Sequence, residues 1–591
     1  MRKRIIVVVL GAFLFLGFGW LLSQQNPEDA KFTKTMESYL DEYWKFYPTA
    51  GTMVGYTKYN DRLEDLSESA VEKRGLALDG YNKEFVTKII KDKLSPDFQI
   101  DRDLLMDAID FELLRLDNLV PQQYNPVFYN DIILNCMRSL LVREFGPIEA
   151  RLKSATERAK QLPGFLRQAK ENLKTPPKEY TEAAIKQFSA IADFYKNEIP
   201  KIIETVSGDV KTRFQAELEK VIPALWDYQR FLQGDLLGKS TGNFRLGADA
   251  HTRLLRLTCQ GNLPMQDILA IAKADSVNIR NEMGLIAMPF YRIMYPNQNM
   301  EQLSVQYKDK VDQLRTIFIK GVLDKIKVEH ATKENYLDRI RASVDDIKAF
   351  LTQSKILDVP EENLAVIATP AASRGMLWVR LLSPYPYEPS GRYAAQIHPV
   401  PDDWPNDQVQ SFLEEYNNYM LTMWTIEKVY PGPFFPAALT RKNPSLLRRL
   451  YPNEPLIKGW PIYAEDMFIY AGFGNYDLKL RLNELKLKLR AVIDFQLEIS
   501  VHQFGLAKEE AIRLMTITGL QTPAEAERKW NQIVLNPGEA AYSYIGYQEI
   551  LDMEKDYKKL NGDAFSQKEF LKKLVSYGAI PPRALKPKLS Q

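Results

Sequence analysis

The side chains best suited to metal or general-base chemistry are scarce in this sequence. Four histidines, His251, His330, His398 and His502, occur in its 591 residues, although histidine is a common zinc ligand and general base near neutral pH. None of them begins a His-Glu-x-x-His motif, and His251 and His330 have no second ligand at metal-binding spacing. We therefore predict packing or surface roles for His251 and His330.

One run resembles a phosphate-binding loop. Residues 234–240 read Gly-Asp-Leu-Leu-Gly-Lys-Ser, but a phosphate-binding loop has one more residue between its glycines and follows a strand rather than a helical segment. We predict a helix end here instead. Cys136 and Cys259 are the two cysteines of the chain, too few for a disulfide framework, and we expect two separate buried thiols.

The charge balance argues against a nucleic-acid partner. The 78 Lys and Arg residues nearly offset the 76 Asp and Glu residues, giving a formal net charge of +2, whereas nucleic-acid binding requires a local excess of cations. Hydrophobic residues make up 45% of the chain and charged residues 26%. This composition is typical of a globular protein with a large core.

The N-terminal segment differs from the rest of the chain. Basic residues 2–4 precede an unbroken apolar run over residues 5–22, which as a helix would be about 27 Å long, close to the thickness of a bilayer core. We predict a signal anchor over residues 1–24 that crosses the cytoplasmic membrane, with the N-terminus in the cytoplasm and the main body outside the cell membrane. The alternative is a cleaved signal peptide. No cysteine follows the run, which argues against a lipid anchor.

Helical periodicity dominates the remaining residues, 25–591. Between Asp477 and Val501, apolar residues recur at spacings of three and four, as on one face of a long helix. Similar segments span about 66–93, 145–174, 178–206, 208–236, 263–289, 299–325, 333–352, 405–428, 536–560 and 566–577. Prolines and glycines between about 360 and 400 favour short strands instead. We predict a mainly α-helical, compact body with a small inserted β-sheet.

Several C-terminal stretches, read together, resemble a known family. They are residues 425–434 (Thr-Ile-Glu-Lys-Val-Tyr-Pro-Gly-Pro-Phe), 458–465 (Lys-Gly-Trp-Pro-Ile-Tyr-Ala-Glu), 490–502, 537–546 and 570–581. In order and spacing they resemble the exported bacterial family called domain of unknown function 885. The resemblance implies a large helical body similar to zinc metallopeptidases, with the active-site half at about 405–591.

The sequence departs from that family where the chemistry would lie. Members typically carry His-Glu-x-x-Pro-Gly-His, followed by Glu-Gly-Trp, which together imply two histidine ligands, a glutamate base and a further carboxylate ligand. Here Glu427 replaces the first histidine, Lys428 the glutamate base and Pro433 the second histidine. Lys458 replaces the glutamate of Glu-Gly-Trp. Proline has no donor, and lysines repel a divalent cation. We therefore expect no metal cofactor, and an ion pair between Glu427 and Lys428 or Lys458.

The frame around the replaced residues is retained. It contributes six further candidates for a cleft, which are Tyr430, Trp460, Tyr463, Glu465, His502 and Tyr544. Among them, Glu465 and His502 could still act as acid, base or ligand, but two groups do not make a zinc site. The aromatic candidates could equally be core residues.

These observations favour a catalytically inactive metallopeptidase homologue that acts by binding. Its ligand would be a peptide, an envelope fragment, or a membrane-protein partner docked beside the anchor. One alternative is a metal-independent hydrolase that uses Glu427, Glu465 or His502, which requires a carboxyl group with a raised pKa in an apolar cleft. Another alternative is an accessory subunit of a membrane complex.

Overall fold

The structure, a computed structural model, describes residues 26–261, 264–370, 378–388 and 390–590 and is mainly α-helical, as predicted. The predicted signal anchor over residues 1–24 lies outside the described residues. Within the described part of the chain, no helix is both long enough and apolar enough to cross a membrane.

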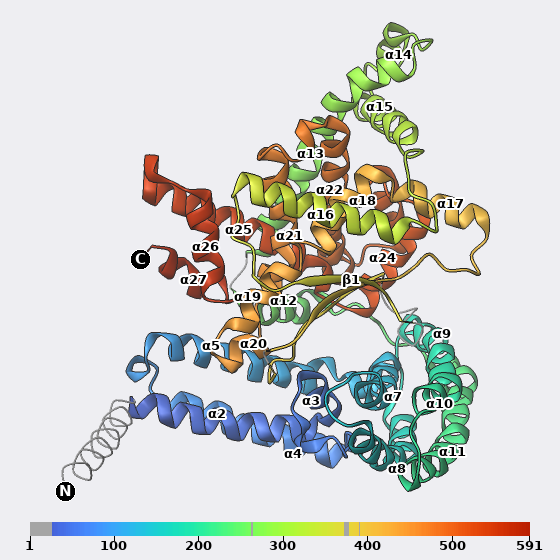
Figure 1. Cartoon of the computed structure of the whole chain (residues 1–591), viewed down its shortest axis with the longest axis vertical. Helices are drawn as coiled ribbons and strands as arrows, with labels where there is room; N and C mark the ends of the chain where they lie inside the picture. Colours follow the sequence, from blue (N-terminus) through green and yellow to red (C-terminus); the bar gives the residue numbers. More distant parts are fainter. Residues whose placement is uncertain (1–25, 262–263, 371–377, 389, 591) are drawn as a thin grey trace, which may run out of the picture.

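The N-terminal helices form the lower part of the molecule in Figure 1. They are α2 (Pro27–Phe46), α3 (Pro48–Val54), α4 (Glu68–Thr87), α5 (Pro96–Leu114), α6 (Pro121–Tyr124), α7 (Pro126–Leu141), α8 (Ile148–Asn172), α9 (Lys178–Asp193), α10 (Ile199–Ile202) and α11 (Asp209–Arg230). One apolar core lies among α7, α8, α9 and α11, and a second lies among α2, α4 and α5. Leu447, from far along the chain, completes the second core.

The remaining helices form the upper part, and all of them except α20 contribute to one large core. They are α12 (Gly247–Thr258), α13 (Met265–Met294), α14 (Met300–Gln306), α15 (Val311–Ile326), α16 (Tyr336–Ser354), α17 (Asn406–Glu415), α18 (Asn418–Lys428), α19 (Phe434–Lys442), α20 (Leu446–Leu450), α21 (Glu454–Tyr470), α22 (Leu478–Phe504), α23 (Lys508–Arg513), α24 (Pro523–Leu535), α25 (Glu539–Asn561), α26 (Gln567–Ser576) and α27 (Pro582–Leu589). Helices α14 and α15 project from the body.

Helix α22 lies at the centre of this upper part. It packs against α12, α13, α18 and α25. The sequence indicated a single apolar stripe on this helix, yet polar side chains such as Glu484, Lys486 and Glu498 are buried as well. Neighbouring helices cover α22 on several sides, so its buried surface extends beyond the stripe.

The predicted small sheet is confirmed. It consists of β1 (Leu364–Ala368), β2 (Val379–Leu382) and β3 (Tyr393–Ile397), in the order β1-β3-β2. Strand β1 is parallel to β3 and β2 is antiparallel to it. The sheet lies between the lower and upper helices in Figure 1, and β3 supplies much of its buried face.

Helices α21 and α25 approach each other unusually closely. A Cβ added at Gly459 would lie 2.2 Å from the backbone of Gly546, and one added at Gly546 would lie 1.7 Å from the Pro455 carbonyl oxygen. Only glycine fits at both positions, since real Cβ contacts do not become this short. This contact sets the distance between the two helices that carry Lys458 and Glu539.

Glu549, on α25, is a buried carboxyl outside the cleft described below. Burial raises its pKa to about 8, and one of its oxygens has no hydrogen-bond partner. The native state therefore keeps a proton that the unfolded chain releases near pH 4.3, so stability falls as pH rises from about 4.3 to about 8. We expect Glu549→Gln to flatten this slope and to raise the free energy of unfolding at pH 8.5 by roughly 2 kcal/mol.

The measurement is urea unfolding of the two proteins at pH 5, 7 and 8.5. The exposed Glu301 on α14 provides the matched control, because Glu301→Gln removes a carboxylate from the surface. Equal pH slopes for Glu549→Gln and the unmodified protein would show that this carboxyl ionises normally.

Candidate functional site

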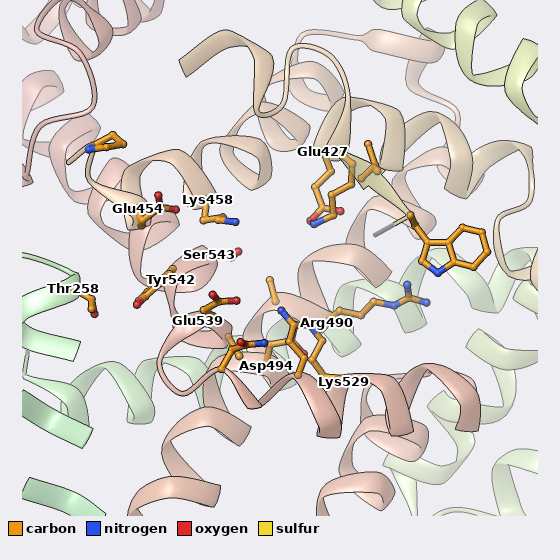
Figure 2. Close-up of a pocket in the computed structure, with 18 of the residues that line it drawn as sticks. Thr258, Glu427, Glu454, Lys458, Arg490, Asp494, Lys529, Glu539, Tyr542 and Ser543 are labelled. Atoms are coloured by element: carbon orange, nitrogen blue, oxygen red, sulfur yellow. The ribbon is translucent and has the colours of Figure 1, made fainter. Parts of the chain in front are cut away.

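A large cleft lies between the lower and upper helices. Its volume is about 1240 Å³, and its walls come from α2, α5, α12, α18, α21, α22, α24 and α25 together with the strand region. Figure 2 shows Glu427 pointing into the cavity from one side and Lys458 from the other. Three of the four replaced positions, Glu427, Lys428 and Lys458, therefore line the cavity, and Pro433 does not.

Glu427 and Lys428 form an ion pair at the end of α18. Lys428 Nζ lies 2.8 Å from Glu427 Oε1, and the two side chains are 44% and 14% exposed. Of the two pairings expected for Glu427, the structure shows this one. Burial opposes the charge of Lys428, but the carboxylates of Glu427 and its neighbours outweigh that effect and raise the pKa of Lys428 above its usual value. The ammonium therefore stays charged.

The local sequence explains how this pair is positioned. The Asn417 side chain accepts hydrogen bonds from the first free backbone N–H groups and so begins α18. After α18 ends, the chain turns back through Gly432, where a Cβ would lie 2.7 Å from the Ile426 carbonyl oxygen. Backbone packing therefore requires glycine at position 432, independently of any metal.

Lys458 is an exposed ammonium within the cleft. In the part of the chain that the structure describes, it has no carboxylate within ion-pair distance. The nearby Glu539 carboxyl is desolvated by the surrounding protein, which raises its pKa, and the charge of Lys458 partly opposes that shift. Lys458 therefore offers its hydrogen-bond donors to the cavity.

The cleft floor holds a second set of charges on α22 and α24. Lys529 Nζ lies 2.6 Å from Asp494 Oδ2, and Arg490 bonds to Glu415 and Glu525. Burial raises the pKa of Asp494 even though Lys529 lowers it. These contacts keep most of the floor internally neutral.

Aromatic rings form one wall of the cleft. Trp378 stacks on Phe412 at 4.8 Å and meets Trp404 edge-on at 5.5 Å. Phe412 contacts Tyr416 at 4.8 Å, and Tyr416 contacts Trp424 at 5.9 Å. All but Phe412 line the cleft. We call these five residues the aromatic wall. The sequence analysis did not predict it. The only sequence feature that could have indicated it is the concentration of aromatic residues between positions 404 and 424.

The structure places the other predicted residues behind the cleft surface. Among the described lining residues, the cleft includes none of Tyr430, Pro433, Trp460, Tyr463, Glu465, His502 and Tyr544. The four aromatic candidates have partners in the core: Tyr430 stacks on Phe434, Trp460 stacks on Phe435, the Tyr463 hydroxyl accepts from Gln567, and the Tyr544 hydroxyl donates to Asp275.

Glu465 is a fully buried carboxyl just behind Glu427. Both of its oxygens lack a hydrogen-bond partner. Burial, followed by the charges of Glu427 and Glu484, raises its pKa well above the usual range. Burial therefore favours the protonated form of Glu465, and this residue does not line the cavity.

His251 and His502 meet around Glu498 in a buried cluster. Their rings stack 5.0 Å apart, and His251 Nε2 lies 2.8 Å from Glu498 Oε1. The same oxygen accepts a hydrogen bond from the Gly538 N–H, and burial lowers the pKa of His502. The predicted packing role of His251 is confirmed, but its partner comes from 247 residues away. In the described part of the chain, no group of three or more His, Cys, Asp and Glu side chains is arranged to hold a metal.

The remaining sequence motifs have structural roles. Cys136 and Cys259 are separate buried thiols, and residues 231–239 complete a helix end, both as predicted. Residues 238–242 also read Gly-x-Ser-x-Gly, but Ser240 is buried, where its hydroxyl bonds to the Leu236 carbonyl and to Thr181. The Ser240 hydroxyl is therefore not exposed to a substrate as a nucleophile would be.

Comparison with known sequences decides the family. The model described as a bacterial protein of unknown function (DUF885) matches residues 48–589. The chain belongs to this family. Its resemblance to domain of unknown function 885 is therefore confirmed over nearly the whole described chain. No curated protein matches it.

Two solved structures share the fold. One, from Shewanella oneidensis, is described as "a putative lipoprotein of unknown function"; it is 23% identical, covers 95% of this chain and 100% of its own, and has a TM-score of 0.81. The other, described as "the putative lipoprotein from Colwellia psychrerythraea", is 15% identical, covers 95% and 98%, and has a TM-score of 0.73. The fold is thus shared with proteins of these two bacteria.

Proposed function

We propose that the protein binds an extended ligand in the cleft, a peptide or a peptide-bearing fragment of the cell envelope, and does not hydrolyse it with a metal ion. The arrangement of ammonium groups carries this proposal. Lys428 is bonded to Glu427 on one side of the cavity, and Lys458 points into the cavity from the other. A carboxylate on the ligand is the natural partner for Lys458.

The metal site implied by the family resemblance does not fit these residues. Glu427 already bonds to Lys428, and Pro433 has no donor and is not part of the cleft lining. Lys458 would place a positive charge beside a divalent cation, which Coulomb repulsion disfavours. A catalytic zinc needs about three donor side chains, and these positions do not supply them.

The size and lining of the cleft favour an extended ligand. Its volume of about 1240 Å³ exceeds the roughly 300–1,000 Å³ typical of small-molecule sites. The aromatic wall offers apolar area for a hydrophobic side chain. Exposed Glu454 and Glu539 lie near Lys458, so the cleft presents both signs of charge, as the backbone ends and side chains of a peptide require.

The proposed location is the bacterial cell envelope, outside the cytoplasmic membrane. The basic and apolar residues at the N-terminus support export, and the fold is shared with two proteins described as lipoproteins. No cysteine comes directly after the apolar run, so we propose attachment through the anchor segment rather than through a lipid.

The test measures peptide binding to the full-length protein in a mild non-ionic detergent. The probes are fluorescent tripeptides with an aromatic first residue, made either with a free C-terminal carboxylate or as C-terminal amides. We expect the carboxylate forms to bind about tenfold more tightly, because a charge-assisted hydrogen bond contributes about 1.5 kcal/mol or more. Lys458→Gln should remove that preference.

Lys572→Gln on α26 is the matched control, since Lys572 is exposed and outside the cleft. It should leave both affinities unchanged. Equal binding of acids and amides to the unmodified protein would contradict the assigned role of Lys458. One tightly bound zinc per chain, measured by elemental analysis, would contradict the metal-free mode.

One observation favours a second candidate, a metal-independent hydrolase. Asp494 lines the cleft, and burial raises its pKa, which suits a general acid. Peptide cleavage that is lost in Asp494→Asn and is unaffected by a chelator would support this candidate over the first.

A further inference from the structure

Five arginines from four secondary-structure elements and one turn gather on the molecule outside the cleft. Arg138 belongs to α7, Arg143 to the turn that follows α7, Arg380 to β2, Arg441 to α19 and Arg449 to α20. None of the five is among the described residues that line the cleft. We call this set the arginine cluster. Arg380 is exposed and Arg143, Arg441 and Arg449 are half-buried, so a ligand can reach the set from solvent.

The fold brings the cluster together where the strand region meets both halves of the molecule. The Arg143 guanidinium lies over the ring of Tyr385, in the segment that follows β2. Arg441 Nη1 donates to the Arg449 carbonyl oxygen at 2.7 Å and so ties α19 to α20. The first contact holds the turn after α7 against the segment after β2, and the second holds two helices together.

The guanidinium groups repel one another. Burial, followed by the charge of Arg380, lowers the pKa of Arg138 to about 10. Burial also lowers the pKa of Arg143 to about 10, and the charges of Arg380 and Arg441 add to that effect. Burial also lowers the pKa of Arg441, and the positive charge of Arg449 lowers it further. The five residues are therefore electrostatic neighbours.

For four of the five arginines, no described carboxylate offsets this repulsion at close range. Within the described ranges, no carboxylate lies at ion-pair distance from Arg143, Arg380, Arg441 or Arg449; Glu388 acts only on Arg143, from further away. The Nε–H groups of Arg441 and Arg449 are buried without a hydrogen-bond acceptor.

The neighbouring arginine on α20 provides the contrast. Arg448 Nε bonds to Asp101 at 2.8 Å, and its Nη2 bonds to Asp97 at 3.0 Å. The chain therefore pairs one arginine of α20 with two carboxylates and leaves the next, Arg449, beside Arg441. A set of neighbouring guanidinium groups is stabilised when a multivalent anion binds between them.

We propose that the arginine cluster binds a phosphate-bearing ligand. Guanidinium groups bind phosphate through two parallel hydrogen bonds, and each phosphate monoester offers three acceptor oxygens and up to two negative charges. Several such groups on one ligand would match several arginines. The headgroup of an anionic phospholipid and a soluble phosphorylated molecule share this chemistry.

The test is isothermal titration of the full-length protein in non-ionic detergent at low salt. The probes are sodium tripolyphosphate, dihexanoyl phosphatidylglycerol below its micelle concentration, dihexanoyl phosphatidylcholine and a short polyglutamate peptide. We expect tripolyphosphate or phosphatidylglycerol to bind one per chain, with an affinity that falls at least tenfold in the double variant Arg380→Gln/Arg441→Gln. Arg213→Gln, at an exposed site on α11, should bind as the unmodified protein does.

Thermal unfolding keeps loss of binding distinct from loss of folding. Without ligand, Arg380→Gln should melt at the same temperature as the unmodified protein or higher, because one repelling charge is removed. Stronger binding of phosphatidylglycerol than of tripolyphosphate would identify a lipid source, and the reverse would identify a soluble one. Polyglutamate binding as tightly as either, binding unchanged in the double variant, or no binding of either phosphate probe would overturn the proposal.

Discussion

Gly546→Ala is expected to lower the free energy of unfolding by about 3 kcal/mol or more, and to reduce the yield of folded protein. Overpacking usually costs about 1–3 kcal/mol, and this position is at the severe end of that range. The new Cβ would lie 1.7 Å from the Pro455 carbonyl oxygen, which is backbone and cannot rotate away. Helices α21 and α25 would have to separate, and with them the Lys458 side of the cleft.

The measurement is the urea midpoint of unfolding, followed by circular dichroism and tryptophan fluorescence. Gly75→Ala in α4 is the matched control, since nothing lies within 4 Å of a Cβ at that position. It should stabilise the helix by up to about 1 kcal/mol. A Gly546→Ala protein as stable as the unmodified one would show that α21 and α25 are further apart than described.

Glu112→Ala is expected to cost about 3–5 kcal/mol of folding free energy. Arg74 donates two hydrogen bonds to Glu112, at 2.9 and 2.8 Å, and both side chains are at most 4% exposed. Removing the carboxylate leaves an uncompensated buried guanidinium, the costly way to break a buried ion pair. Tyr39, which also bonds to Glu112, lines the cleft, so peptide binding should weaken as well.

Two variants make this prediction specific. Asp209→Ala removes one partner of an exposed pair with Arg213, in which both side chains are at least 68% exposed, and should cost less than about 1 kcal/mol. The apolar double replacement Arg74→Met/Glu112→Leu should recover much of the stability that Glu112→Ala loses. A cost below about 1 kcal/mol for Glu112→Ala, by urea unfolding, would contradict the buried pair.

Much of the helical architecture could be predicted from periodicity, but α21 could not. Its residues are buried around most of the helix, and it contains Gly459 and Pro461, so no apolar stripe or uninterrupted helical pattern marks it. Residues 299–325 illustrate the opposite error. They read as one helix, yet the chain breaks between α14 and α15 at residues 307–310, where polar residues end the first helix.

One part of the site, the ion pair between Glu427 and Lys428, could be predicted from the sequence. Glu427 and Lys428 are adjacent in sequence, so their pairing needs no knowledge of the fold. The aromatic wall and the contact between His251 and Glu498 join residues that are far apart in the chain. Nothing in a single sequence indicates which distant segments meet.

The sequence by itself determined the chemical character of this protein: a helical chain of the DUF885 family whose expected ligand positions hold Glu427, Lys428, Pro433 and Lys458. Only the tertiary structure decided which side chains face the cleft. Lys458 and Trp460 are two residues apart, but at 3.6 residues per turn their directions differ by about 200°. The lysine therefore points into the cavity, while the indole stacks on Phe435 in the core. That direction depends on how α21 packs, which residue types and spacing do not specify.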